Sequence, residues 1–193
     1  MARTKEFDPD AALRAALELF WRRGYEATSM ADLVEHLGIG RASIYATFGS
    51  KRRLYQRALE HYAEIRDPDP VTVLSQPGPV LPAVRALLET YTRQMIEDET
   101  RRGCFVVNTA VELAPHDGKA ARSVAAAWAE IETALVSALV RARAQGELPP
   151  DRDPHALARF LLVMLQGIRV VGKGDPDPAR LRDALREALR LLE

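Results

Sequence analysis

The sequence predicts an all-α protein with about nine helices in two parts. Apolar residues recur every three or four positions along most of the 193 residues, and no stretch alternates in the way a strand requires. One segment breaks this pattern, residues 67–82, which is rich in proline and glycine. The length suits a small N-terminal domain and one further domain, and 47% hydrophobic content is enough for a packed core.

The first helix is expected to begin at Asp8 and Pro9. An aspartate followed by proline supplies a helix cap and then a first-turn residue whose missing N–H is not needed. Its apolar stripe is Leu13, Leu17 and Phe20, and Gly24 ends it. This helix is therefore the first of three that form the N-terminal domain.

Residues 28–54 predict two short helices joined by a tight turn. The first spans about 29–37, with Thr28 as its cap and an apolar stripe made by Met30, Leu33, Val34 and Leu37. Gly38, Ile39 and Gly40 form the turn, because glycine adopts the left-handed backbone that a helix end needs. Two helices joined in this way are typical of a DNA-binding helix-turn-helix.

The second short helix, about 41–47, presents a surface suited to the major groove of DNA. Ile44 and Phe48 face inward, which leaves a mostly polar remainder outside. Together with Thr28 and Lys51, the outward residues are the predicted DNA contacts: Arg41, Ala42, Ser43, Tyr45 and Thr47.

Charge supports this prediction. The chain has 27 basic and 27 acidic residues, yet residues 41–57 contain five basic residues and no acidic one. Attraction to phosphate is therefore local. Ser50 is expected to cap the next helix, so its first amides and Lys51 would point at one phosphate.

The rest of the chain predicts a larger helical domain, residues 51–193, with the N-terminal domain assigned to residues 1–50. A linking helix runs to about residue 65. Beyond the break, apolar stripes predict helices near residues 84–95, 104–115, 118–145, 153–171 and 178–192. The stripe of the helix at 118–145 is Val124, Trp128, Ile131, Leu135 and Leu139.

The N-terminal residues resemble the DNA-binding domain of the TetR family of bacterial transcriptional regulators. The family pattern is Phe-x-x-x-Gly-Tyr, a capping Thr, and then Gly-Val-Ser-x-x-x-Leu-Tyr-x-x-Phe-x-x-Lys. The matching positions are Phe20, Gly24, Tyr25, Thr28, Gly38, Ile39, Gly40, Ile44, Tyr45, Phe48, Lys51 and Leu54. Two positions depart from it: Gly40 replaces the usual serine, and Thr47 replaces a frequent histidine. The resemblance implies a homodimeric repressor of double-stranded operator DNA.

The helix at 153–171 is apolar on nearly every side, so one face can pack in the protein's own core while another meets a partner. In the TetR family the last long helices of two subunits pair as a four-helix bundle. The helices at 118–145 and 153–171 resemble that pair, whereas a wholly internal core helix is the alternative. Two-fold pairing also sets two recognition helices about 34 to 36 Å apart, for successive major grooves.

Family members also hold a small-molecule effector among their middle helices. The residues that could line such a site here are aromatic, sulfur-containing or amide side chains, although such residues at helical spacing also form ordinary cores. The candidates are Tyr91, Met95, Phe105, Asn108, Trp128 and Met164.

Residues 101–108 resemble the segment that carries the sensing cysteine of the electrophile-responsive, N-ethylmaleimide-type TetR repressors. Lys173 stands where those proteins place a lysine beside the cysteine. A nearby cation would make the Cys104 thiol more reactive, whereas a buried thiol would act only in packing.

Two other functions fit parts of the sequence. The helical hairpin could be a protein-interaction module that never meets DNA. An enzyme with Cys104 as nucleophile and His116 as base would lack an orienting carboxylate and a phosphate-binding loop, so no enzyme, cofactor or metal is predicted. No stretch resembles a membrane span, and residues 1–10 lack the apolar run of a signal peptide, which predicts a cytoplasmic protein.

Overall fold

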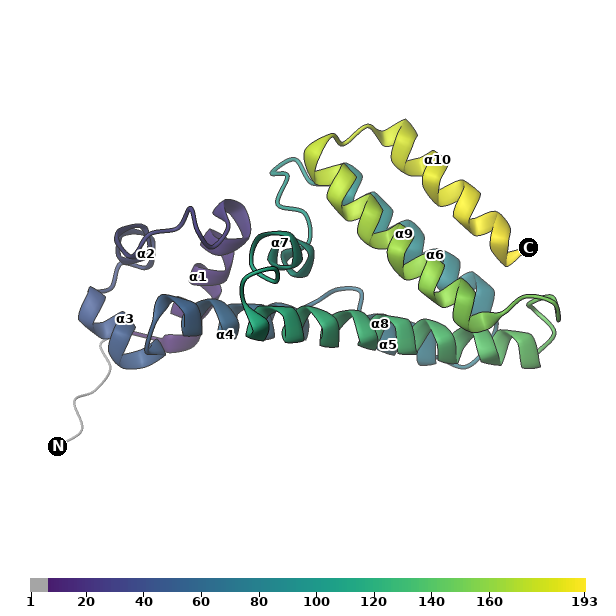
Figure 1. The fold of residues 1–193 in the computed structure, drawn as a ribbon, viewed down its shortest axis with the longest axis horizontal. Helices are drawn as coiled ribbons and strands as arrows, with labels where there is room; N and C mark the ends of the chain where they lie inside the picture. Colours follow the sequence, from purple (N-terminus) through teal and green to yellow (C-terminus); the bar gives the residue numbers. More distant parts are fainter. Residues whose placement is uncertain (1–6) are drawn as a thin grey trace. The chain divides into compact units, whose positions relative to one another are not determined.

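The computed structural model describes residues 7–193, so part of the segment used in the signal-peptide argument lies outside it. The described chain is all-α, as predicted (Figure 1). Ten α-helices are followed by a short 3-10 turn, Arg190–Leu192. The helices are α1 (Pro9–Arg23), α2 (Met30–Leu37), α3 (Arg41–Phe48), α4 (Lys51–Glu64), α5 (Pro70–Ser75), α6 (Val80–Glu97), α7 (Phe105–Glu112), α8 (Gly118–Ala144), α9 (Pro154–Gly174) and α10 (Pro178–Leu189).

Four helices begin with the same two residues, an aspartate cap and a proline. The caps are Asp8, Asp69, Asp153 and Asp177, and each carboxylate accepts a hydrogen bond from a backbone N–H of the first turn. Proline fits the next position because its ring fixes a helical φ. This pair therefore sets the start of α1, α5, α9 and α10.

The region of residues 67–82 is more helical than the sequence suggested. It contains α5, which places Leu74 in a core, and α6 begins at Val80 instead of near Val84. The earlier start has a tertiary cause, because the Glu147 carboxylate accepts from the N–H groups of Val80 and Leu81 at 2.8 and 2.9 Å. A distant side chain thus caps this helix end.

The chain divides into two compact units. The first contains residues up to Arg66 together with Cys104–Ala121, and the second contains Asp67–Gly103 and Arg122–Glu193. This division differs from the predicted boundary after residue 50. The linking helix α4 buries Leu54, Tyr55, Ala58 and Leu59 and packs against α1, α3 and α7, so it is part of the first unit.

Aromatic rings fill the centre of the first unit. Tyr55 packs edge-on against Phe20 at 5.0 Å and against Tyr25 at 5.2 Å between ring centroids. Phe105, from α7, packs against Tyr55 at 5.0 Å and against Tyr62 at 5.7 Å. These contacts join α1, α4 and α7, and we call the five rings of Phe20, Tyr25, Tyr55, Tyr62 and Phe105 the aromatic cluster.

The second unit has a mainly aliphatic core. In it α6 packs against α9 and α10, and α9 packs against α10 (Figure 1). The apolar stripe of α8 enters the same core through Ile131, Leu135 and Leu139. Both α8 and α9 are long and apolar enough to span a membrane by length and composition, but their buried faces belong to this core.

Candidate DNA-binding surface

The helix-turn-helix predicted from the sequence is present as α2, a glycine turn and α3. Gly38 ends α2 with a φ of 67°, in the left-handed region that favours glycine, and its N–H donates to the Val34 carbonyl at 3.0 Å. Leu33 on α2 and Ile44 on α3 are fully buried, so the two helices are fixed against the first unit. The turn therefore holds α3 at a defined angle to α2.

The start of α2 differs from the prediction, because Ser29 and not Thr28 is its cap. The Ser29 hydroxyl accepts from the Asp32 N–H at 3.1 Å, and the Asp32 carboxylate accepts from the Ser29 N–H at 2.8 Å, which completes a capping box. Thr28 is fully buried and donates its hydroxyl to the Gly24 carbonyl at 2.7 Å. Its side chain is therefore not available to DNA, and Ser29 occupies the exposed position.

The Asp32 carboxylate of this capping box is also paired with Arg23. Hydrogen bonds from the Ser29 side chain and backbone, together with the Arg23 guanidinium at 2.8 Å, hold the pKa of Asp32 below its ordinary value. The carboxylate thus stays ionised at neutral pH and remains an acceptor for the first turn of α2.

The outer surface of α3 is exposed, as the sequence predicted. Arg41, Ala42, Ser43 and Tyr45 all lie on it, with Tyr45 42% exposed, and Thr47 is half-buried. On the opposite side, Ile44 and Phe48 are buried. Gly40 is the helix cap and offers no side-chain hydrogen bond, so nothing covers the N-terminal end of α3 from that position.

Lys51 begins α4 beside this surface. The Ser50 hydroxyl accepts from the Arg53 N–H at 3.1 Å, which confirms the predicted cap of α4. The Lys51 ammonium lies over the Tyr25 ring, 4.1 Å from its centroid. Partial burial lowers the pKa of Lys51, while the carboxylates of Glu26, Glu112 and Asp32 act in the opposite direction. The ring thus fixes where this cation lies at the first turn of α4.

Sequence reasoning missed the contacts that α7 and the loop after it make with this surface. The Arg52 guanidinium on α4 pairs with the Asp117 carboxylate at 2.5 Å, and this pairing holds the pKa of Asp117 below its ordinary value. The Glu112 carboxylate accepts from two backbone N–H groups in the turn between α1 and α2. No local spacing in the sequence indicates these pairs, because the partners are more than 60 residues apart.

The predicted effector residues are divided between the two units. Cys104, Phe105 and Asn108 belong to the first unit, whereas Tyr91, Trp128 and Lys173 belong to the second. Phe105 is fully buried in the aromatic cluster. Buried Cys104 caps α7 and accepts a long hydrogen bond from the Tyr62 hydroxyl, 3.7 Å from Sγ.

In the second unit, Tyr91 is a core residue whose hydroxyl donates to the Pro68 carbonyl at 2.7 Å. Trp128 packs against the same core, and its indole N–H is buried without a hydrogen-bond partner. The Lys173 side chain lies beside Gly103, within 3.2 Å of where a Cβ would stand. Between α5 and α8 there is a mostly apolar hollow of about 540 Å³, and none of the predicted effector residues lines it.

No pattern in the sequence predicted that Arg169 on α9 is buried. Its side chain is 7% exposed and is the one charged side chain among the buried residues that the structure describes. The guanidinium lies over the Tyr91 ring, 4.5 Å from the centroid, and donates to the Gln166 side chain at 3.3 Å. An arginine in an apolar helical stripe gives no local sign of whether its guanidinium is buried.

Known proteins match both parts of the chain. Residues 12–58 match the family described as bacterial regulatory proteins, tetR family, and residues 80–188 match the family described as tetracyclin repressor-like, C-terminal domain. These two ranges include the helix-turn-helix and most of the second unit.

Similarity to individual proteins extends over the whole length. The uncharacterized HTH-type transcriptional regulator YezE of Bacillus subtilis (strain 168) is 37% identical over 194 residues, covering 100% of both chains. The HTH-type transcriptional repressor ComR of Escherichia coli (strain K12) is 33% identical over 190 residues, covering 98% of this chain and 90% of ComR.

Among solved structures, a cysteine mutant of the TetR family transcriptional regulator CifR, complexed with 26bp double-strand operator DNA, has a TM-score of 0.85. It is 33% identical in sequence, and the match covers 98% of each chain. The exposed α3, the acid-free basic segment and these full-length similarities together confirm the resemblance seen in the sequence. The chain belongs to the TetR family of transcriptional regulators.

Proposed function

We propose that the chain is a homodimeric repressor that binds double-stranded operator DNA through α3 and is released by a small-molecule or electrophilic effector. The exposed polar face of α3 is the observation that carries the proposal, because its buried side, Ile44 and Phe48, fixes the helix while leaving its outer residues free. A helix held in this way can enter a major groove. Similarity to a regulator complexed with operator DNA supports the same function.

Contacts of two kinds are expected at this surface. Lys51, Tyr45 and Thr47 suit phosphate contacts, which fix the position of the protein on the duplex without reading its sequence. Arg41 and Ser43 suit base edges, where a bidentate contact contributes roughly 1–3 kcal/mol of discrimination. Ala42 can contact a thymine methyl group.

Fluorescence anisotropy with the DNA upstream of the protein's own gene tests this proposal, across a salt series and with scrambled competitor. Replacing Lys51 by Ala should weaken binding to all sequences and make the slope of log K against log salt shallower by about one unit. Lys119→Ala removes the same charge from an exposed position of the first unit and is the matched control. Equal, weak binding to specific and scrambled DNA would favour the protein-interaction module instead.

Effects of substitution at Arg41 or Ser43 distinguish the two kinds of contact. Loss of a base contact should relax preference at particular positions of the operator. A uniform loss of affinity for every sequence would make these residues phosphate contacts.

For dimerisation, the structure changes which helices we expect to take part. The apolar stripe of α8 is used inside the second unit, and of its large hydrophobic residues only Val140 is exposed. In contrast, α9 leaves Phe160, Val163, Val170 and Val171 exposed, with Val163 69% exposed. An apolar stripe of this size on a helix surface is typical of an interface.

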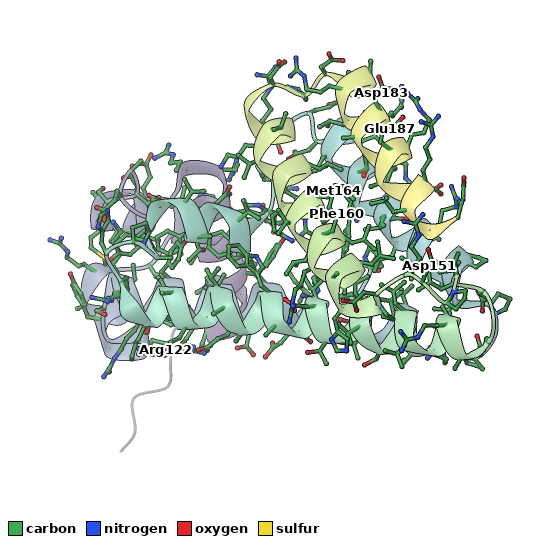
Figure 2. The ribbon with its side chains drawn as sticks, turned by 45° about the vertical axis from the view of Figure 1, so that its right-hand side comes forward. Arg122, Asp151, Phe160, Met164, Asp183 and Glu187 are labelled. Atoms are coloured by element: carbon green, nitrogen blue, oxygen red, sulfur yellow. The ribbon has the colours of Figure 1, made fainter. Side chains whose placement is uncertain are left out.

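We therefore place the dimer interface on α9 and the neighbouring α10, instead of on α8 and α9. Phe160 and Met164 lie one turn apart on α9, and Asp183 and Glu187 lie one turn apart on α10 (Figure 2). Apolar residues on α9 would form the centre of a four-helix bundle and charged residues on α10 its rim. Analytical ultracentrifugation should show a dimer that Val163→Glu dissociates, whereas Val140→Glu on α8 should leave it intact.

The effector remains a small molecule or an electrophile that reacts with Cys104. The resemblance of residues 101–108 to the segment that carries the sensing cysteine of electrophile-responsive repressors supports the electrophile class. Burial of Cys104 argues for a packing role. Alkylation should release DNA from the wild-type protein, and a Cys104→Ser protein that is still released would exclude this mechanism.

Family membership supports regulation of transcription, and we propose no enzymatic activity and a cytoplasmic location. The alternative enzyme function would use Cys104 as nucleophile and His116 as base. Cys104 is buried at the start of α7, whereas His116 is exposed in the loop beyond its end. A nucleophile and its base must lie within hydrogen-bond reach, so this arrangement does not support the alternative.

A further inference from the structure

One carboxylate holds the turn that precedes the helix-turn-helix. The Glu112 side chain, in the last residue of α7, accepts from the Tyr25 N–H at 3.0 Å through Oε2 and from the Glu26 N–H at 2.8 Å through Oε1. Both donors are consecutive backbone amides, so the two oxygens of one carboxylate bind one peptide segment. Hydrogen bonds to a charged acceptor are stronger than those between neutral groups.

Gly24 makes this contact possible in two ways. Its φ of 85° lies in the region that side chains rarely adopt, and it ends α1 by donating its N–H to the Phe20 carbonyl. A Cβ at this position would lie 2.9 Å from Glu112 Oε2 and 3.0 Å from Oε1. The turn therefore has both the backbone shape and the space that the carboxylate requires.

The residue held by Glu112 also holds a DNA-contact residue. The ring of Tyr25 lies under the Lys51 ammonium, at 4.1 Å, and packs edge-on against Tyr55. The backbone N–H of Tyr25 is bound by Glu112. One tyrosine therefore connects the end of α7 with the cation at the start of α4.

Other contacts fix α7 in the position that this connection needs. Thr109 donates its hydroxyl to the Phe105 carbonyl at 2.8 Å and accepts from the Tyr55 hydroxyl at 2.9 Å. Burial raises the pKa of Tyr55 far above its ordinary value, so the phenol remains a donor. After α7, the Asp117 carboxylate pairs with Arg52, the residue that follows Lys51.

We propose that Glu112 is a positioning residue for operator binding, acting through Tyr25 on Lys51. This inference rests on the function proposed above. When the carboxylate is bound, the ring of Tyr25 and the ammonium above it are held where α4 meets DNA phosphate. When it is withdrawn, two backbone donors lose their acceptor, and both the ring and the start of α2 are less restrained.

The test is Glu112→Gln in the full chain. The amide keeps the size of the side chain but turns one acceptor into a donor that faces a backbone N–H. Operator affinity should fall by about tenfold, the effect of losing one charge-assisted hydrogen bond. Loss of a negative charge alone would strengthen DNA binding, so a weaker complex cannot arise from charge.

Two controls separate positioning from general damage. Glu60→Gln removes the same charge from an exposed position on α4 and should leave operator affinity unchanged or slightly higher. In a Lys51→Ala background, Glu112→Gln should lose most of its effect on operator affinity, because Glu112 is proposed to act on DNA binding through Lys51. A merely structural role would give the same loss in both backgrounds.

Hydrogen exchange of the free protein tests the contact without DNA. The amides of Tyr25 and Glu26 should exchange at least about tenfold faster in Glu112→Gln, with little change elsewhere in α1 and α4. If that variant does not fold, Glu112→Asp keeps the charge on a shorter side chain and should show the same direction in both measurements.

Unchanged operator affinity, or unchanged exchange of these two amides, would overturn the proposal. If the wild-type protein binds no operator, the proposed DNA-binding function itself is wrong. The exchange result then shows only whether Glu112 restrains the turn between α1 and α2. Failure of the positioning role and failure of the proposed function are thus distinguishable.

Discussion

The two units of this protein are built from different kinds of core. Every aromatic pair that the described chain forms lies in the first unit, where ring centroids are 4.9 to 6.3 Å apart. The second unit packs mostly leucine, valine and alanine from long helices. Edge-to-face rings with bonded hydroxyl groups define one geometry, whereas aliphatic cores tolerate repacking. The unit that contains the helix-turn-helix therefore has the more specific packing geometry, and the aliphatic core of the second unit should tolerate more repacking.

The largest expected effect is in the aromatic cluster. Phe105→Ala removes a fully buried ring that joins α7 to α4, and it should lower the free energy of unfolding by about 3–5 kcal/mol. Leu165→Met in the second unit preserves volume and should cost less than about 1.5 kcal/mol. Phe105→Leu, which keeps a large apolar side chain, is the matched partner of Leu165→Met. Urea unfolding of these variants measures the contrast, and equal costs for Phe105→Leu and Leu165→Met would remove it.

A smaller difference is expected between two buried tyrosines. Tyr55→Phe removes the donor to buried Thr109, whereas Tyr91→Phe removes the donor to the partly buried Pro68 carbonyl. The first should cost about 1.5 kcal/mol and the second about 0.5 kcal/mol, because water can reach the second acceptor more easily. Thermal or urea unfolding of the pair gives the comparison, and the reverse order would show that the Tyr91 hydrogen bond contributes more to stability than the Tyr55 one.

Arg169 distinguishes the two cores in another way, since its charge is buried in the mainly aliphatic second unit. Arg169→Met replaces it with an apolar side chain of similar length. The free energy of unfolding should be unchanged or rise by about 1 kcal/mol. Burying the guanidinium charge destabilises the fold by more than its hydrogen bond to Gln166 and its contact with the Tyr91 ring stabilise it. A clear loss of stability would mean that the guanidinium is well compensated.

The smallest effect concerns the surface pair of the first unit. Because the Arg52 guanidinium lowers the pKa of Asp117 below 3.8, this pair stabilises the folded state above that pH. Its contribution should be lost as the pH falls from about 4 toward the lower folded pKa. In urea unfolding across this range, Asp117→Asn should be less stable than wild type only at the higher pH. A difference that persists in acid would mean that the pairing is not ionic.

Local signals in the sequence predicted most of the helices, including the two of the helix-turn-helix. Asp8 and Pro9, Asp153 and Pro154, and the glycine at position 38 mark helix ends through hydrogen bonds between near neighbours. The same logic missed α5, because its Asp69-Pro70 start lies within a proline-rich segment. It also chose Thr28 as a cap where Ser29 serves, since both residue types cap helices and only packing shows which one is buried.

The sequence by itself determined the helical class, the helix-turn-helix and the family, because these depend on the order of residues a few positions apart. Only the tertiary structure decided that α7 belongs with the DNA-binding helices, that Glu112 binds the amides of Tyr25 and Glu26, and that α9 keeps an exposed apolar face. Those contacts join residues as many as 87 positions apart. Which distant residues meet depends on how the loops connect the helices in space, and no local pattern of residues specifies that.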